Sequence, residues 1–176
     1  FDFSTDSSFL SVSGLSEYKL YNAKSQIVDL NNDGKKEIIS LGLTGNTSSS
    51  KLKLYVLELD PTATTPTLKI TDQSDKITTL TASSFDFGDY DGDQDIDFLI
   101  SGISANGLAS LLYKNNTEPG GQLSITQTTN DFVAVRDGTT DFIDFDSDGD
   151  LDVIYTGTAA GGDVFEIYLN ELNEGK

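Results

Sequence analysis

Residues 144–157 read DFDSDGDLDVIYTG, and two related stretches occur earlier in the chain, DYDGDQDIDFLISG at residues 89–102 and DLNNDGKKEIISLG at residues 29–42. Each stretch carries oxygen-bearing side chains at positions 1, 3, 5 and 9 and a glycine at position 14. These side chains are Asp29, Asn31, Asp33 and Glu37 in the first copy, Asp89, Asp91, Asp93 and Asp97 in the second, and Asp144, Asp146, Asp148 and Asp152 in the third. Position 6 is glycine in the first and third copies and Gln94 in the second.

This density of carboxylates predicts a bound cation. Unit charges a few ångströms apart repel by about 1 kcal/mol per pair in water, and no lysine or arginine alternates with the acids of the second and third copies. Calcium is the natural partner, because it takes about 6–8 oxygen ligands. Positions 1, 3 and 5 fit the first half of an EF-hand loop, but position 12, where an EF-hand needs an acid, is Ser40, Ile100 or Tyr155. We therefore predict about three Ca²⁺ ions in loops of another kind.

The residues after each acidic run indicate what flanks these loops. EIISLGL, DFLISGI and DVIYTGT are apolar, rich in β-branched residues and interrupted by glycine, which is typical of strands. Each copy is thus predicted to be a strand, a calcium loop and a second strand. The alternative is an acidic solvated turn, since Asp, Asn and Gly favour turns. Turn chemistry alone does not require an acid at positions 1, 5 and 9 in all three copies.

The copies start 60 and 55 residues apart, and a period of this length indicates a repeat architecture. Each period also contains two further strand-like segments, so that four antiparallel strands are expected per repeat. The predicted first strands are residues 25–30, 83–89 and 140–146; the third strands are 51–59, 108–115 and 163–170; the fourth strands are 67–72 and 122–127. The predicted fold class is all-β, with about three four-stranded antiparallel β-propeller blades that form part of a larger propeller.

We divide the chain as a single repeat array. Residues 1–24 would hold the outer strand of a preceding blade and a lead-in, 25–80 the first blade, 81–135 the second, and 136–176 an incomplete third blade. Residues 1–6 have the character of a fourth strand, which could pair with the third strand of the last blade. Propellers close with about 4–8 blades, so we expect either a segment of a longer propeller or self-association of copies. The chain starts at Phe1 and is accordingly a mature product or a piece of a longer protein.

The acidic stretches resemble the FG-GAP and VCBS repeats of calcium-binding β-propellers, which also build the heads of integrin α-subunits. FGDYDGDQDIDFLISG at 87–102 and IDFDSDGDLDVIYTG at 143–157 match that pattern closely, and VDLNNDGKKEIISLG at 28–42 is a plainer version. The resemblance implies one Ca²⁺ between the first two strands of each blade, held by the side chains at positions 1, 3, 5 and 9. It adds a backbone carbonyl at position 7, which is Lys35, Asp95 or Asp150. Gln94 departs from the family's glycine, and a left-handed backbone there costs about 1 kcal/mol.

Composition excludes several classes of function. The net charge is −18, from 29 acids and 11 bases, which disfavours nucleic acid and anionic membranes as partners. Histidine and cysteine are absent, which removes imidazole bases, thiol nucleophiles and the usual zinc ligands. No apolar run approaches the roughly 18 residues of a membrane span. Calcium loops of this kind suit an extracellular or cell-surface location, where the ion is abundant.

These observations predict a secreted or cell-surface module that binds a protein or glycan in adhesion and is not an enzyme. The alternatives are the propeller domain of a secreted polysaccharide-active enzyme, and a passive structural or exported cargo segment. Tyr55, Tyr113 and Tyr168 lie in the predicted third strands, where we expect them to pack inside the blades and not to form a ligand platform.

Overall fold

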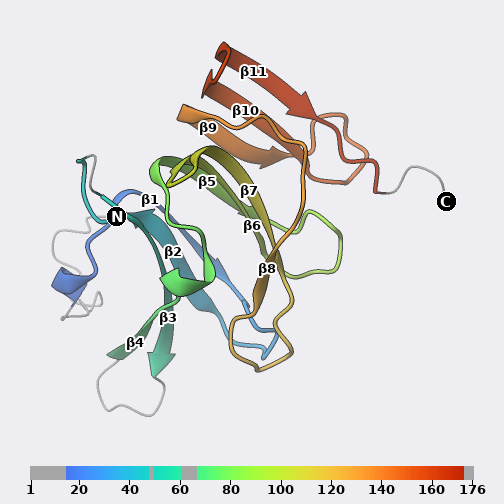
Figure 1. The fold of residues 1–176 in the computed structure, drawn as a ribbon. Coiled ribbons are helices and arrows are strands. Elements are labelled where there is room, and N and C mark those ends of the chain that lie inside the picture. Colours follow the sequence, from blue (N-terminus) through green and yellow to red (C-terminus); the bar gives the residue numbers. More distant parts are fainter. Residues whose placement is uncertain (1–14, 48–49, 61–66, 173–176) are drawn as a thin grey trace, which may run out of the picture.

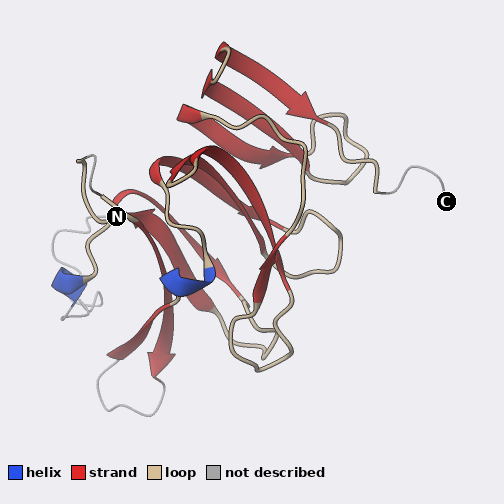
Figure 2. Cartoon of the chain, viewed as in Figure 1, coloured by secondary structure: helices blue, strands red, loops and turns tan. Residues whose placement is uncertain are grey.

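The chain folds into three antiparallel β-sheets that follow one another in sequence order (Figure 1). A computed structural model describes residues 15–47, 50–60 and 67–172 of the 176. Within these ranges the helical elements are two short 3-10 turns, η1 (Leu15–Glu17) and η2 (Ser74–Lys76), and Figure 2 shows strands everywhere else that structure is regular. The predicted fold class, all-β with blade-like sheets, is confirmed.

Each sheet is built from strands in chain order, as expected for propeller blades. The first sheet contains β1 (Tyr21–Val28), β2 (Glu37–Leu43), β3 (Leu52–Asp60) and β4 (Thr67–Asp72). The second contains β5 (Thr81–Gly88), β6 (Asp97–Ser104), β7 (Gly107–Asn115) and β8 (Ile125–Gln127). The third contains β9 (Arg136–Ile143), β10 (Asp152–Ala159) and β11 (Gly162–Tyr168). Every acidic stretch begins after the first strand of its sheet and ends in the second strand.

One strand prediction in the second sheet needs correction. The fourth strand of the second sheet was expected over 122–127 but is only Ile125–Gln127, because the preceding residues fold back on their own connection: Ser124 donates its N–H to Thr117 Oγ1 (3.0 Å) and its carbonyl accepts from Asn116 N (2.7 Å). In the third sheet, the described part of the chain contributes three strands. Residues 1–6, the expected additional strand, lie outside the described residues.

The first strand of each sheet starts with a β-bulge. In the first sheet the strand therefore begins earlier in the chain than predicted. β1 begins at Tyr21, four residues before the start expected at residue 25, and one extra residue is accommodated between Tyr21 and Lys24. Asn22 takes the positive φ of 47° that the bulge requires. A bulge breaks the two-residue alternation by which a strand is recognised, so the pattern hides these residues.

The bulge explains the glycine at position 14. A Cβ on Gly42 would lie 2.8 Å from the Cβ of Ala23, inside the bulge. In the third sheet a Cβ on Gly157 would lie 2.7 Å from the carbonyl oxygen of Arg136, next to the bulged Asp137. The second strand can approach the bulged first strand this closely only where the side chain is absent.

Apolar cores fill the spaces between consecutive sheets. Successive residues of β6 point to opposite faces, so that Phe98 and Ile100 pack toward the first sheet and Leu99 toward the third. All three side chains are fully buried. Opposite them lie residues such as Leu54 of the first sheet and Tyr155 of the third, also fully buried. The middle sheet is therefore covered on both faces, as a blade between two neighbours is.

The tyrosines of the third strands pack as predicted. Tyr113 is buried, and its hydroxyl accepts a hydrogen bond from the N–H of Thr78 (2.8 Å). Tyr168 accepts one from Val133 N (2.8 Å) and contacts the ring of Tyr155 edge-on. Tyr55 is nearly buried and meets Tyr18 edge-on. Each ring thus joins a third strand to the rest of the packed structure.

Candidate metal centres

The three acidic loops share one backbone shape. Positions 4 and 6 have positive φ in every copy, namely 53° at Asn32, 76° at Gly92 and 66° at Ser147, then 84° at Gly34, 74° at Gln94 and 95° at Gly149. The left-handed backbone expected at Gln94 is therefore present. The second loop instead places its glycine at position 4, so one left-handed residue per loop lacks the conformational freedom of glycine. The sequence analysis considered only position 6 and did not predict that the glycine of the second loop lies at position 4 instead.

Position 1 closes each of the first two loops. Asp29 accepts hydrogen bonds from the N–H groups of Asp33 (3.0 Å) and Gly34 (2.9 Å). Asp89 accepts three, from Gly92, Asp93 and Gln94, at 2.8, 3.1 and 2.9 Å. These bonds hold the backbone in a tight ring and set the directions in which the side chains at positions 3 and 5 leave it.

Position 9 is buried at the base of each loop. Glu37, Asp97 and Asp152 each accept the N–H of position 2, from Leu30 (2.9 Å), Tyr90 (3.1 Å) and Phe145 (2.8 Å) respectively. The second oxygens of Asp97 and Asp152 accept a further N–H from the end of the third strand, at 2.8 Å in both sheets.

Burial makes the negative charge at position 9 expensive. It raises the pKa of Asp97 to about 7, although the N–H groups of Asn115 and Tyr90 pull in the opposite direction. A buried carboxylate of this kind is stabilised when a positive charge lies nearby.

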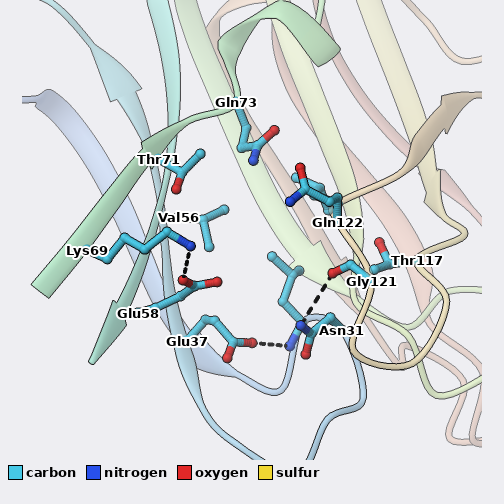
Figure 3. Close-up of a pocket in the computed structure, with 12 residues that line it drawn as sticks. Asn31, Glu37, Val56, Glu58, Lys69, Thr71, Gln73, Thr117, Gly121 and Gln122 are labelled. Atoms are coloured by element: carbon cyan, nitrogen blue, oxygen red, sulfur yellow. Dashed lines mark hydrogen bonds and ion pairs between the residues drawn. The ribbon is translucent and has the colours of Figure 1, made fainter. Parts of the chain in front are cut away.

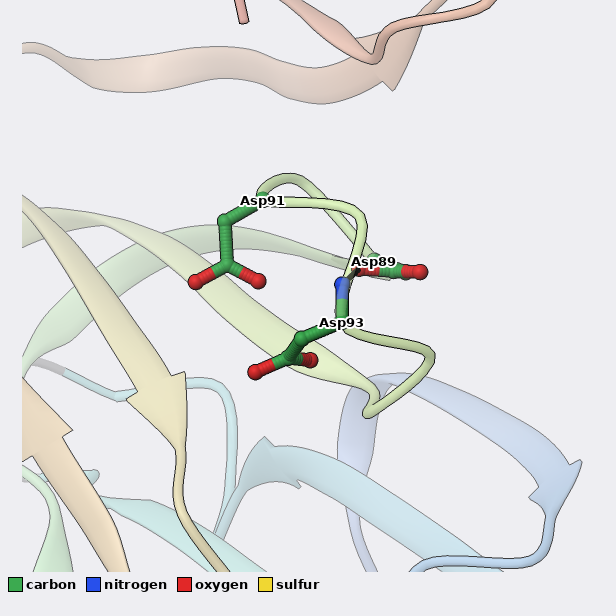
Figure 4. Close-up of side chains that lie close together, drawn as sticks. All are labelled: Asp89, Asp91 and Asp93. Atoms are coloured by element: carbon green, nitrogen blue, oxygen red, sulfur yellow. Dashed lines mark hydrogen bonds between the residues drawn. The ribbon is translucent and has the colours of Figure 1, made fainter.

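Carboxylates converge in the second and third loops. One oxygen from each of Asp89, Asp91 and Asp93 lies within 4.8 Å of the others; Figure 4 shows these residues on the loop between β5 and β6. The third loop brings together Asp144, Asp146 and Asp152 by the same criterion. Among the described residues, the first loop forms no such group.

The remaining predicted ligands have local partners. In the first loop, Asp33 accepts from the backbone N–H (2.8 Å) and the ammonium (3.0 Å) of Lys35. In the third loop, Asp148 accepts from Asp150 N (2.9 Å) and stays outside the carboxylate group. The side chain of Asp95, whose carbonyl was the expected ligand, accepts from the amide of Asn32 in the first loop.

The side-chain oxygens at position 3 indicate whether the loops could accommodate a cation. The side-chain oxygens Asn31 Oδ1 and Asp91 Oδ1 are buried and have no hydrogen-bond partner. A buried polar atom without a partner costs about 1–3 kcal/mol, so such atoms are uncommon in folded proteins. One buried side-chain oxygen at the same loop position thus has no partner in two of the repeats, and positions 1, 5 and 9 of both loops carry carboxylates. This donor set fits a hard divalent cation such as Ca²⁺.

Two asparagines that sequence reasoning missed connect the loops to the next sheet. Asn115, at the end of β7, donates its side-chain amide to the carbonyl of Leu30 (3.2 Å), and Asn170, just after β11, donates to the carbonyl of Tyr90 (2.7 Å). Both acceptors are position 2 of the loop in the preceding sheet. The two asparagines could have been recognised from a sequence pattern that they share, Tyr-x-Asn, which is YKN at 113–115 and YLN at 168–170.

Lys114 is a further residue near a loop that the sequence analysis did not predict. Its ammonium contacts Asp91 and lies 2.9 Å from Asp93 Oδ2, so a lysine from β7 enters the second acidic loop. The expectation that these acids lack a basic neighbour holds within the loop sequence but not in the folded chain. Strand pairing creates this contact, and 21 residues separate the lysine from Asp93 in sequence.

A polar pocket of about 180 Å³ lies beside the first loop (Figure 3). Its wall includes the ion pair of Glu58 and Lys69 (2.7 Å) and Asn31, whose amide faces the carbonyl of Gly121 (3.4 Å). The acids that line it, Glu37 and Glu58, are thus engaged with a backbone N–H and a lysine respectively. Beside the pocket, the first loop contacts the connection between β7 and β8, because Gly120 donates its N–H to the carbonyl of Asn31 (2.7 Å).

Comparison with known proteins identifies the repeat. Residues 29–100 match the sequence model of the FG-GAP-like repeat, a range that includes the first two loops and the strand after each. Neither the search of curated proteins nor the search of solved structures found a match. The resemblance is therefore shown for residues 29–100, which match an FG-GAP-like repeat, and the antiparallel sheets of the chain are consistent with propeller blades. No helix in the described ranges is long and apolar enough to cross a membrane.

Proposed function

We propose that the chain is a calcium-binding β-propeller segment in which the ions are structural. The observation that carries this proposal is the unpaired, buried oxygen at position 3, found in two loops whose other side chains are also oxygen donors. A bound ion would provide the missing partner and neutralise the converging carboxylates. FG-GAP-like repeats are often calcium-binding, which supports the same assignment.

The ligands proposed are those expected from the repeat. The side chains at positions 1, 3, 5 and 9 and the carbonyl at position 7 would hold one Ca²⁺ per loop, about three in all. In the third loop, Asp144, Asp146 and Asp152 already lie together. In the first loop, the side chain of Asp33 must leave Lys35 before it can reach an ion. The first loop accordingly needs a local side-chain rearrangement before it can bind an ion.

Calorimetric titration with Ca²⁺ and metal analysis of the dialysed protein test this assignment. We expect a stoichiometry close to three and a melting temperature that falls when EDTA is added, because a ligand that binds only the folded state stabilises it. Asp146→Ala should remove one ion, and Asp75→Ala, an exposed acid in η2, is the matched control. A stoichiometry of zero or one would contradict the proposal.

We further propose an extracellular or cell-surface location and a role in adhesion, with a protein or glycan as ligand. FG-GAP-like repeats are typical of extracellular proteins, and the charge of −18 favours neither nucleic acid nor anionic membrane as a partner. We propose no catalytic role, since the acids of the loops are already assigned to the ions. A glycan array and a pull-down with the intact protein would identify the ligand, and turnover of an arrayed glycan would favour the enzymatic alternative instead.

The third sheet also exposes large apolar side chains. Ile143 at the end of β9, Phe145 in the loop that follows and Phe165 in β11 are all exposed, and exposed apolar side chains of this size can mark an interaction surface. We propose that the remainder of a propeller, or another copy of the chain, covers this surface.

A further inference from the structure

One position on the third strands faces all three acidic loops. Pairing of β6 with β7 places Tyr113 opposite Phe98, so the next residue, Lys114, lies beside Asp97 at position 9. In the third sheet Tyr168 is opposite Val153, which makes Leu169 the equivalent residue. In the first sheet Leu57 is opposite Ile38, and the equivalent is Glu58. A lysine, a leucine and a glutamate therefore occupy one site in three otherwise similar repeats.

The lysine makes strong contacts with the second loop. Its ammonium bonds to the carboxylates of positions 3 and 5, Asp91 and Asp93, which belong to the group of three that converges there. These hydrogen bonds raise the pKa of Lys114 above its usual range. Charge-assisted bonds of this type are about twice as strong as neutral ones.

The other two loops lack this cation. Leu169 is apolar and 53% exposed, and nothing in its side chain can neutralise Asp144 or Asp146. Glu58 is acidic and is paired with Lys69 on the neighbouring strand β4. The second loop alone, among the three, receives an ammonium from its own third strand.

We propose that Lys114 is an intramolecular competitor for the divalent cation of the second loop, so that this loop binds Ca²⁺ more weakly than the third. The inference rests on the proposed function, in which these loops hold Ca²⁺. The ammonium bonds to Asp91 Oδ2 and Asp93 Oδ2, so an ion that binds the unpartnered Asp91 Oδ1 shares both carboxylates with it, and the two positive charges repel each other. The flexible four-carbon stem of lysine allows the ammonium to move away from the loop to solvent.

The same arrangement gives the second loop a property that the third lacks. With calcium removed, the ammonium still neutralises part of the carboxylate charge, so the loop keeps its closed shape. Among the described residues, no ion pair involves the acids of the third loop, which must tolerate their mutual repulsion. Lys114 therefore lowers the affinity of the second loop for Ca²⁺ and makes the shape of that loop less dependent on the ion. The second and third loops accordingly bind Ca²⁺ at different concentrations.

Site-resolved calcium titration tests the proposal. Backbone amide signals of Gln94 and Gly149, both at position 6, report separately on the second and third loops in NMR spectra of the isotope-labelled chain. In the unmodified protein, Gln94 should respond at a higher Ca²⁺ concentration than Gly149. Lys114→Met should lower the midpoint at Gln94 by about tenfold, because a competing charge at a partly buried surface has been removed, and should leave Gly149 unchanged.

A reciprocal variant keeps the test valid if Lys114→Met disturbs folding. Leu169→Lys installs the ammonium beside the third loop and should raise the Gly149 midpoint by about tenfold. Lys53→Met is the matched control for the loss of one positive charge, since Lys53 lies on the third strand of the first sheet and pairs with Asp72. It should move neither midpoint.

The outcomes separate this inference from the proposed function. If Gly149 responds to calcium but the Gln94 midpoint is the same in the unmodified protein and Lys114→Met, the inference is wrong and the calcium assignment stands. An equal shift in Lys53→Met would also overturn it, by showing a general effect of net charge. If neither signal responds in any variant, the calcium assignment itself fails.

Discussion

The first and third sheets carry the same kind of face in two different situations. Leu30 at loop position 2 and Leu54 on the third strand are 4% and 0% exposed, because the second sheet covers them. Their equivalents in the third sheet, Phe145 and Phe165, are 57% and 66% exposed. The pairing of Leu54 with Leu41 and of Phe165 with Thr156, both at position 13, establishes the equivalence.

This difference shows that the apolar side chains at these positions pack mainly against the following sheet and less within the sheet that carries them. Aromatic residues at Phe145 and Phe165 would have no packing role in an isolated sheet, since within the described residues nothing lies over them. In the middle sheet the equivalent of Phe145 is Tyr90, and it stacks on Phe142 of the third sheet. The third sheet thus exposes large apolar side chains at positions that a neighbouring sheet covers in the first sheet.

Truncating equivalent side chains in the first and third sheets tests whether coverage by the second sheet accounts for the difference. Leu54→Ala should destabilise the protein by about 2–5 kcal/mol, the cost of a cavity in a closed core. Phe165→Ala should change the free energy of unfolding by no more than about 0.5 kcal/mol, as at most surface positions. Denaturant unfolding followed by circular dichroism measures both. Equal losses would mean that Phe165 is covered in solution.

The asparagine contacts test whether consecutive sheets are joined through their loops. Asn115 is buried and bonds to Leu30 O, so Asn115→Ala should cost about 1–3 kcal/mol by leaving the carbonyl unpaired. Asn106→Ala in the exposed turn between β6 and β7 is the control and should be close to neutral. A neutral result for Asn115→Ala would show that packing alone holds the first two sheets together.

The smallest energetic effect concerns association. If the outer face of the third sheet docks another copy, Phe165→Ser should reduce self-association without lowering stability, because it removes apolar area only from the contact surface. Light scattering at several protein concentrations measures this, and Glu166→Gln, the exposed next residue in β11, serves as control. A monomer at every concentration in the unmodified protein would contradict self-association and leave the rest of a propeller as the expected partner.

Much of this architecture could be predicted because the acidic stretches fix both a loop and the two strands around it. Their spacing then leaves room for two more strands per repeat, and β4 lies where its pattern placed it, at Thr67–Asp72. What the sequence did not reveal depends on pairing between distant segments. The bulge at Asn22 disrupts alternation, and the approach of Lys114 to Asp91 exists only once β6 and β7 are in register.

For the candidate metal site, the ligand positions remain a prediction from the sequence pattern. Positions 1, 3, 5 and 9 could be read from the pattern, but their different environments could not. Nothing in the spacing indicates that Asp33 faces Lys35 or that Asp148 stays apart from the carboxylate group of the third loop. These differences arise from side-chain rotations and from neighbours contributed by other strands.

The bonds from Asn115 to Leu30 and from Asn170 to Tyr90 have a consequence for protein engineering. Residues 81–135 contain both halves of this connection, since Tyr90 supplies the acceptor for the following unit and Asn115 the donor to the preceding one. That segment is a self-compatible cassette: a duplicate inserted directly after it would present its own asparagine to the carbonyl of the original Tyr90. Arrays of chosen length could then be assembled by gene concatenation, with the junction chemistry already encoded in each module.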